Sequence, residues 1–170
     1  MGLFDKLTGT QRPPEGVSPV AREALREALL GLSRPEVPYV VRYGGGEQCD
    51  LLAEWRLREP AWRHVFVQSQ ISHAVRIRMR LDHRENEVRA LEEQWELSRT
   101  DSPTGLQVTS EYTRGPSRTV SRRWTIGRGT DGHIEATETF RFDSAQLREP
   151  LRDTVLGSGW TWRGVVFGKL

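Results

Sequence analysis

The most constraining feature of this chain is an alternation of apolar and polar residues with a period of two. It is clearest in AVRIRMRLD, residues 74 to 82, where every second residue is apolar and arginines stand between them. The apolar set is Val75, Ile77, Met79 and Leu81, and the other set is Arg76, Arg78 and Arg80. Successive side chains of a β-strand point to opposite faces, so the pattern predicts a strand with one buried face and one face that carries three guanidinium groups.

The same period recurs through most of the chain and predicts a protein built on a sheet. Further strand-like segments stand at residues 38–43, 49–57, 87–98, 106–112, 120–126 and 134–142. Apolar residues at helical spacing between 18 and 32, together with Pro60 and Pro150 at positions typical of a first helical turn, predict helices. We therefore expect an α+β fold: a curved antiparallel sheet of about seven strands with an N-terminal helix, a short inserted helix and a short C-terminal helix.

Length and the positions of glycine and proline predict a single domain. A chain of 170 residues is long enough for one hydrophobic core and too short for two comfortable ones. Glycine, threonine and proline between residues 8 and 18 should interrupt regular structure. We expect residues 1–17 to be a flexible N-terminal segment and residues 18–170 to form the α+β domain.

Cysteine content, hydropathy and charge exclude several classes of protein. The single cysteine, Cys49, rules out an intramolecular disulfide, and neither cysteines nor histidines stand at the spacing of a common zinc site. No apolar run approaches the roughly 20 residues of a membrane-spanning helix and no signal peptide is present, so we expect a cytoplasmic protein. The formal net charge of +2 predicts no partner by itself. We expect no metal and no cofactor, since the glycine-rich match GRGTDG lies in a predicted hairpin.

The hairpin that follows the arginine row indicates what those arginines contact. If Met79 lies opposite Ala90, the same register places Glu92 on the apolar face. A one-residue bulge near Leu91 would return the later apolar residues of this strand to the core. The bulge would also bring Glu92 opposite Arg78, so that part of the arginine row would have a carboxylate across the strand pair.

Two charged residues at core-facing positions are the most pointed candidates for a binding site. In the hairpin of residues 118–142, pairing Gly127 with His133 would place Arg122 opposite Glu138 on the apolar side. A buried ion pair loses solvation and therefore needs an explanation. Two interpretations stay open, a polar anchor inside a ligand pocket on the concave face of the sheet and a structural pair at the open edge of the sheet. For the pocket, the ligand-binding residues would be Arg122, Glu138, Trp124, Tyr112, Phe140 and Ser110.

A run of arginines suggests a different function. Between Tyr112 and Asp131 the chain has arginines and no acidic residue. With Tyr112 and Trp124 among them, these arginines could bind the phosphates of a nucleic acid or of an anionic lipid. The anion-binding residues of this alternative are Arg114, Arg118, Arg123 and Arg128. The glutamates on neighbouring strands and the small net charge argue against nucleic acid.

The chain shows no catalytic motif, because no set of residues supplies a nucleophile, an acid, a base and a stabilising group in a known arrangement. We therefore expect a non-enzymatic binding or interaction module whose partner is a small amphiphilic ligand or another protein. An electrostatic binder using the arginines between 114 and 128 is the alternative, and an enzyme with a site assembled from distant residues is the third possibility. The sequence predicts no oligomeric state.

Four segments, MGLFDKL, DLLAEWR, MRLD and the terminal GWTWRGVVFGKL, are distinctive in wording. Together they resemble a family of small, uncharacterised soluble proteins from actinobacteria, and the resemblance covers nearly the whole chain. No activity, cofactor or binding residue of that family can be transferred to positions of this sequence. The resemblance implies a bacterial cytoplasmic protein and nothing about mechanism.

Overall fold

A computed structural model of the protein describes residues 8–46, 48–68, 73–99, 106–114, 120–128, 134–166 and 170. In chain order its helices and strands are α2 (Arg22–Leu30), β1 (Tyr39–Tyr43), β2 (Leu51–Trp55), α3 (Pro60–Gln68), β3 (His73–Asp82), β4 (Glu87–Arg99), β5 (Leu106–Arg114), β6 (Val120–Arg128), β7 (Ile134–Asp143), α4 (Ser144–Gly157) and β8 (Thr161–Gly164). None of the described helices is long and apolar enough to cross a membrane.

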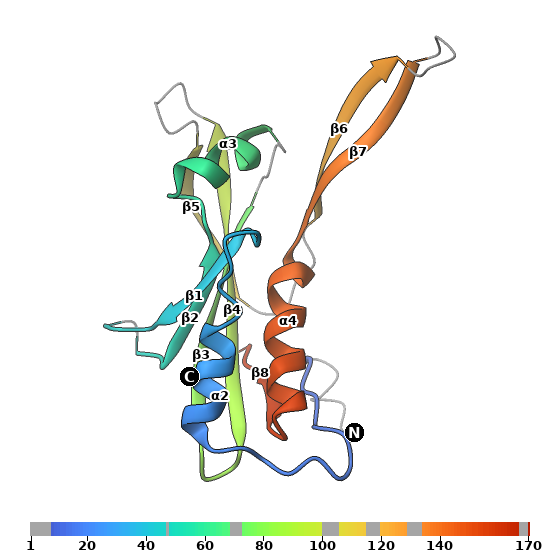
Figure 1. The fold of residues 1–170 in the computed structure, drawn as a ribbon. Helices are drawn as coiled ribbons and strands as arrows, with labels where there is room; N and C mark the ends of the chain where they lie inside the picture. The colour runs from blue at the N-terminus through green and yellow to red at the C-terminus, as the bar shows by residue number, and fades with distance from the viewer. Residues whose placement is uncertain are drawn as a thin grey trace.

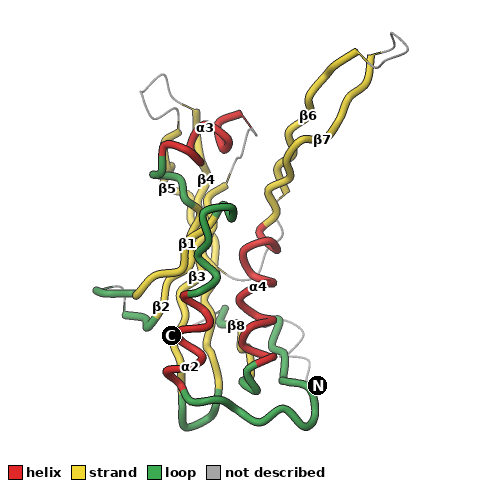
Figure 2. Tube along the Cα trace, viewed as in Figure 1, coloured by secondary structure: helices red, strands yellow, loops and turns green. Residues whose placement is uncertain are grey.

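The strands form one main sheet and one separate ribbon (Figure 1). In the main sheet β1 to β5 follow one another and every neighbouring pair is antiparallel, whereas β8 pairs in parallel with the first part of β4. Strands β6 and β7 pair with each other and extend away from the main sheet beyond the start of α4 (Figure 2). The α+β class is confirmed. The expectation of about seven antiparallel strands was wrong, because β6 and β7 leave the sheet and β8 is parallel.

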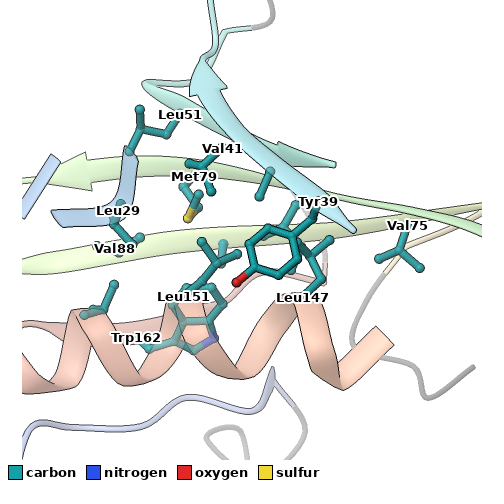
Figure 3. Packing of buried hydrophobic residues seen from close by; sticks show 14 of the residues in the cluster. Leu29, Tyr39, Val41, Leu51, Val75, Met79, Val88, Leu147, Leu151 and Trp162 are labelled. Carbon is teal, nitrogen blue, oxygen red and sulfur yellow. The ribbon is translucent and has the colours of Figure 1, made fainter. Parts of the chain in front are cut away.

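The hydrophobic core lies between one face of the main sheet and the helices α2 and α4. The apolar residues predicted from the period-two pattern of β3 all face it, and none is more than 3% exposed: Val75, Ile77, Met79 and Leu81. Leu25 and Leu29 of α2 and Leu147 and Leu151 of α4 are fully buried in the same cluster. Figure 3 shows the two α4 leucines beneath the apolar side chains of the strands. Each such side chain contributes roughly 1.5 to 3 kcal/mol through burial.

Strands β3 and β4 pair without the bulge that the sequence suggested. Met79 lies opposite Ala90, as predicted. The register then continues unbroken, so Arg78 lies opposite Leu91, and Glu92 lies opposite a buried isoleucine on the core face. The predicted bulge near Leu91 was therefore wrong. The irregularity of β4 lies further along the strand, where it pairs with β5.

Helix α4 is longer than the short helix that the sequence predicted. It begins at Ser144 and not at Pro150. The side chain of Asp143 accepts a hydrogen bond of 2.9 Å from the backbone nitrogen of Ala145 and so caps the first turn. Pro150 stands inside the helix. The earlier start brings an additional turn of side chains against the sheet, including the buried Leu147.

The hydrophobic core includes a titratable tyrosine. Tyr39 of β1 is 4% exposed, and burial raises the pKa of its phenol above the ordinary value of 10.0, an effect that the positive charge of Arg34 partly offsets. Because the folded-state pKa is the higher one, the unfolded chain loses its proton first, and the free energy of unfolding should fall as the pH rises above about 10. Denaturant unfolding at a series of alkaline pH values should show a smaller loss of stability in Tyr39→Phe than in the unmodified protein. Tyr43→Phe, which removes an exposed phenol from the same strand, should behave like the unmodified protein. Equal losses of stability in all three proteins would contradict a raised pKa at Tyr39.

Candidate functional site

The centre of β4 carries two adjacent buried carboxylates. Glu92 is 5% exposed and Glu93 is 1% exposed. Neighbouring residues of a strand point to opposite faces, so one carboxylate lies on each side of the main sheet. Because a buried charge is tolerated only when it is paired and hydrogen-bonded, each needs partners from its own side.

Glu93 lies on the side of the arginine row and is fully engaged there. Its Oε2 accepts hydrogen bonds from Nε and Nη2 of Arg76 at 3.0 and 2.8 Å, and its Oε1 accepts one from Nη2 of Arg78 at 2.7 Å. The Arg76 guanidinium also lies 4.6 Å from the centre of the Trp95 ring. These contacts occupy both carboxylate oxygens, so Glu93 joins β3 to β4 as a structural ion pair.

Glu92 lies on the opposite side, within the apolar layer between the sheet and α4. Nη1 of Arg148 reaches across from α4 and donates to its Oε2 at 2.9 Å, and Nε2 of Gln94 donates to its Oε1 at 3.2 Å. Gln94 is itself 5% exposed. Glu92 and Gln94 therefore occupy positions of β4 that the alternation would assign to apolar side chains.

A cavity of about 380 Å³ opens beside this ion pair, and we call it the Glu92 cavity. Its apolar wall consists of Ile77, Ala90 and Trp162, all nearly fully buried. Its charged residues are Glu92, Arg148 and Arg152, which leave an excess of one positive charge. The partner of Arg152 is the solvent-exposed Asp153, at 2.8 Å from Nη2.

The N-terminal segment supplies the remaining wall through Thr8, Gly9 and Gln11. The backbone nitrogen and oxygen of Gln11 each make a 2.8 Å hydrogen bond with the backbone of Trp162 in β8. Gly164 allows the close approach of this segment, because a Cβ at that position would overlap the carbonyl oxygen of Thr8. The part of the chain expected to be a flexible segment thus includes residues that contact the domain at the cavity.

The side chains of the cavity combine an apolar surface with charged groups. Its described lining contains neither histidine nor cysteine, and the hydroxyl of Thr8 is hydrogen-bonded to the hydroxyl of Thr10 at 2.7 Å. No group of three metal-binding side chains occurs among the residues that the structure describes. What the arrangement offers is an apolar surface next to guanidinium groups, which complements a molecule with an apolar body and an anionic group.

The predicted ligand-binding residues are divided between two sheets. Ser110 and Tyr112 lie in β5 of the main sheet, and the other four lie in the ribbon: Arg122 and Trp124 in β6, and Glu138 and Phe140 in β7. Ser110 and Tyr112 therefore do not share a sheet with the predicted ion pair. Their part in ligand binding stays a prediction.

The predicted register of the ribbon was wrong. Glu138 lies opposite Trp124, and Arg122 lies opposite Arg141. A register shift between Arg123 and Trp124 moves the pairing by one further residue along β7, so that Phe140 lies opposite Arg123. The predicted pairing of Arg122 with Glu138, on which the proposed pocket depends, is therefore not the pairing found in the ribbon.

The arginines of the electrostatic alternative are likewise dispersed. Arg114 is exposed at the end of β5, where it lies opposite Glu93 in the register. Arg123 and Arg128 belong to β6, and Arg118 lies outside the described residues. This alternative stays a prediction.

The sequence contained one signal for the site that the structure reveals. The register anchored by Met79 and Ala90 already placed Glu92 on the apolar face, and the bulge was invoked to remove it. Arg148 carried no comparable signal, because its helix was expected to begin only at Pro150.

Comparison with protein-family models, with curated proteins and with solved structures finds no match for the chain.

Proposed function

We propose that this protein is a non-enzymatic binding module that holds a small amphiphilic molecule, with its anionic group bound by arginine, in the Glu92 cavity. The observation that carries the proposal is the ion pair of Glu92 and Arg148 inside an apolar layer, directly beside a cavity. Replacing a buried ion pair by apolar residues often stabilises a protein, so retaining one beside an open space favours a role in recognition.

The shape and chemistry of the cavity define the class of ligand. Its volume of about 380 Å³ lies within the range typical of small-molecule sites. Trp162 and Ile77 would contact the apolar body of the ligand. Arg152, whose ion pair with Asp153 is open to solvent, would exchange that carboxylate for the carboxylate, sulfonate or phosphate of the ligand. Arg148 is already held by Glu92, so we assign it the role of fixing the polar end of the cavity.

A binding module of this kind could instead present a surface to another protein, and the ribbon β6–β7 favours this second candidate. Within the described chain these strands pair only with each other, and two-stranded ribbons are marginally stable on their own in water. Native mass spectrometry of freshly purified protein separates the two forms, because a retained small-molecule mass supports the cavity and a specific oligomer supports the surface. We also propose a bacterial cytoplasmic location.

Titration with anilinonaphthalene sulfonate, an anionic amphiphile, tests the cavity directly. Arg152→Gln should weaken binding by about tenfold to a hundredfold, since a hydrogen bond to a charged group contributes about 1.5 to 3 kcal/mol. Ala90→Leu, which adds volume to the apolar wall, should abolish binding. Arg58→Gln removes an exposed arginine elsewhere with the same change in charge and should bind normally. Unchanged dye binding in both cavity variants, combined with no retained mass, would refute the proposal.

A further inference from the structure

The turn between β3 and β4 brings together arginines that the Glu92 cavity does not use. Arg80 of β3 lies directly opposite Arg89 of β4 in the register. Like charges opposite one another on neighbouring strands are destabilising. In Figure 1 this turn forms the lower end of the main sheet.

Among the described residues, one side-chain carboxylate, that of Glu87, forms an ion pair with this pair of arginines. Glu87 contacts Arg89 at 3.2 Å, but it also contacts Arg163 at 3.4 Å. Nη1 of Arg80 donates instead to the backbone oxygen of Leu170 at 3.0 Å. Glu85 of the turn is exposed and forms none of the ion pairs found among the described residues. The carboxylate of Glu87 therefore serves two guanidinium groups.

These arginines line a second cavity of about 500 Å³, which we call the turn cavity. Arg22 of α2 and Arg84 of the turn also line it, as do two aspartates. Asp50 is engaged by Nη2 of Arg22 at 2.8 Å and by the backbone nitrogen of Leu81 at 2.7 Å.

The second aspartate, Asp82, accepts a hydrogen bond of 3.1 Å from the backbone nitrogen of Arg84. The Arg84 side chain is exposed and forms no ion pair within the described part of the chain. The four arginines and two aspartates of the lining leave an excess of two positive charges among these side chains. The arginines of the lining that form no ion pair with either aspartate are Arg80, Arg84 and Arg89.

We propose that the turn cavity is an anion-binding site for a phosphate group, either as the free ion or on a small organic molecule. Several planar guanidinium groups around one concave surface match the oxygens of phosphate, and a bound dianion would remove the repulsion between Arg80 and Arg89. The site is independent of the amphiphile proposed above, because the two cavities share no lining residue.

Thermal unfolding and titration calorimetry with inorganic phosphate, compared with chloride at equal ionic strength, test the site. Phosphate should raise the Tm of the unmodified protein beyond the effect of chloride, because a ligand that binds the folded state stabilises it. The double variant Arg80→Gln with Arg89→Gln should bind phosphate at least about tenfold more weakly, since it loses two charged donors. Arg84→Gln tests the same site without altering a strand and should also weaken binding.

Arg58→Gln serves as the control and should retain the phosphate response of the unmodified protein. Phenyl phosphate forms a second arm of the titration. Tighter binding of phenyl phosphate than of inorganic phosphate identifies an organic ligand, and the reverse order identifies the free ion. An equal phosphate response in all variants, or no response beyond that of chloride, would overturn the inference.

Discussion

Replacing Glu93 by glutamine should lower the free energy of unfolding by about 3 kcal/mol or more. The Glu93 side chain is 2% exposed and is the carboxylate that holds both Arg76 and Arg78. The substitution leaves two guanidinium groups, themselves about four-fifths buried, without a negative charge between them. Equilibrium unfolding in urea, with the midpoint and slope compared between the two proteins, measures the loss.

Glu54→Gln provides the matched control on the neighbouring strand β2. Glu54 pairs with Arg42 at 3.0 Å, but both side chains are at least one-third exposed, so its loss should cost no more than about 1 kcal/mol. Similar destabilisation by the two substitutions would show that the arginine row does not depend on Glu93.

Trp160→Ala should destabilise the protein by about 3 to 5 kcal/mol. Trp160 is 1% exposed, and its indole nitrogen donates a 2.9 Å hydrogen bond to the carbonyl oxygen of Val20, near the opposite end of the sequence. The side chain therefore fixes the entry to α2 against the segment between α4 and β8. Thermal and urea unfolding report the loss.

Trp160→Phe separates packing from hydrogen bonding at this position. Phenylalanine retains much of the apolar area but leaves the Val20 carbonyl without its donor, so we expect a smaller loss of about 1 to 3 kcal/mol. If the alanine variant were as stable as the unmodified protein, the burial of Trp160 would be refuted.

Local pattern was sufficient where one strand alone decides which side chains are buried. In β3 the four apolar residues predicted for the core are buried, and the start of the hairpin has the predicted register. Each of these predictions depends on the periodicity of a short segment and on the free energy of burying apolar surface.

The same reasoning failed for β4, where the alternation of apolar residues breaks. A carboxylate on the apolar face loses solvation, and the predicted bulge would remove Glu92 from that face. The structure instead supplies Arg148 from α4, which stands 56 residues later in the sequence. The cost of burying a charge depends on partners that only the folded chain brings near, and no local pattern contains them.

The ribbon β6–β7 illustrates the same limit at the level of topology. Both strands were recognised from their alternation, but the sheet to which they belong and their register were not. A shift of one residue changes every cross-strand pair beyond it, as the pairing of Phe140 with Arg123 shows.

By itself, the sequence determined the α+β class, the strand of the arginine row and the apolar residues of that strand, because these follow from side-chain period within one element. Only the tertiary structure decided that Glu93 neutralises two of the three arginines of the row, that Glu92 stays in the core beside a cavity, and that Arg80 faces Arg89. The physical reason is that charges are stabilised by whichever groups come within a few ångströms in space, and that distance is set by the packing of the whole domain.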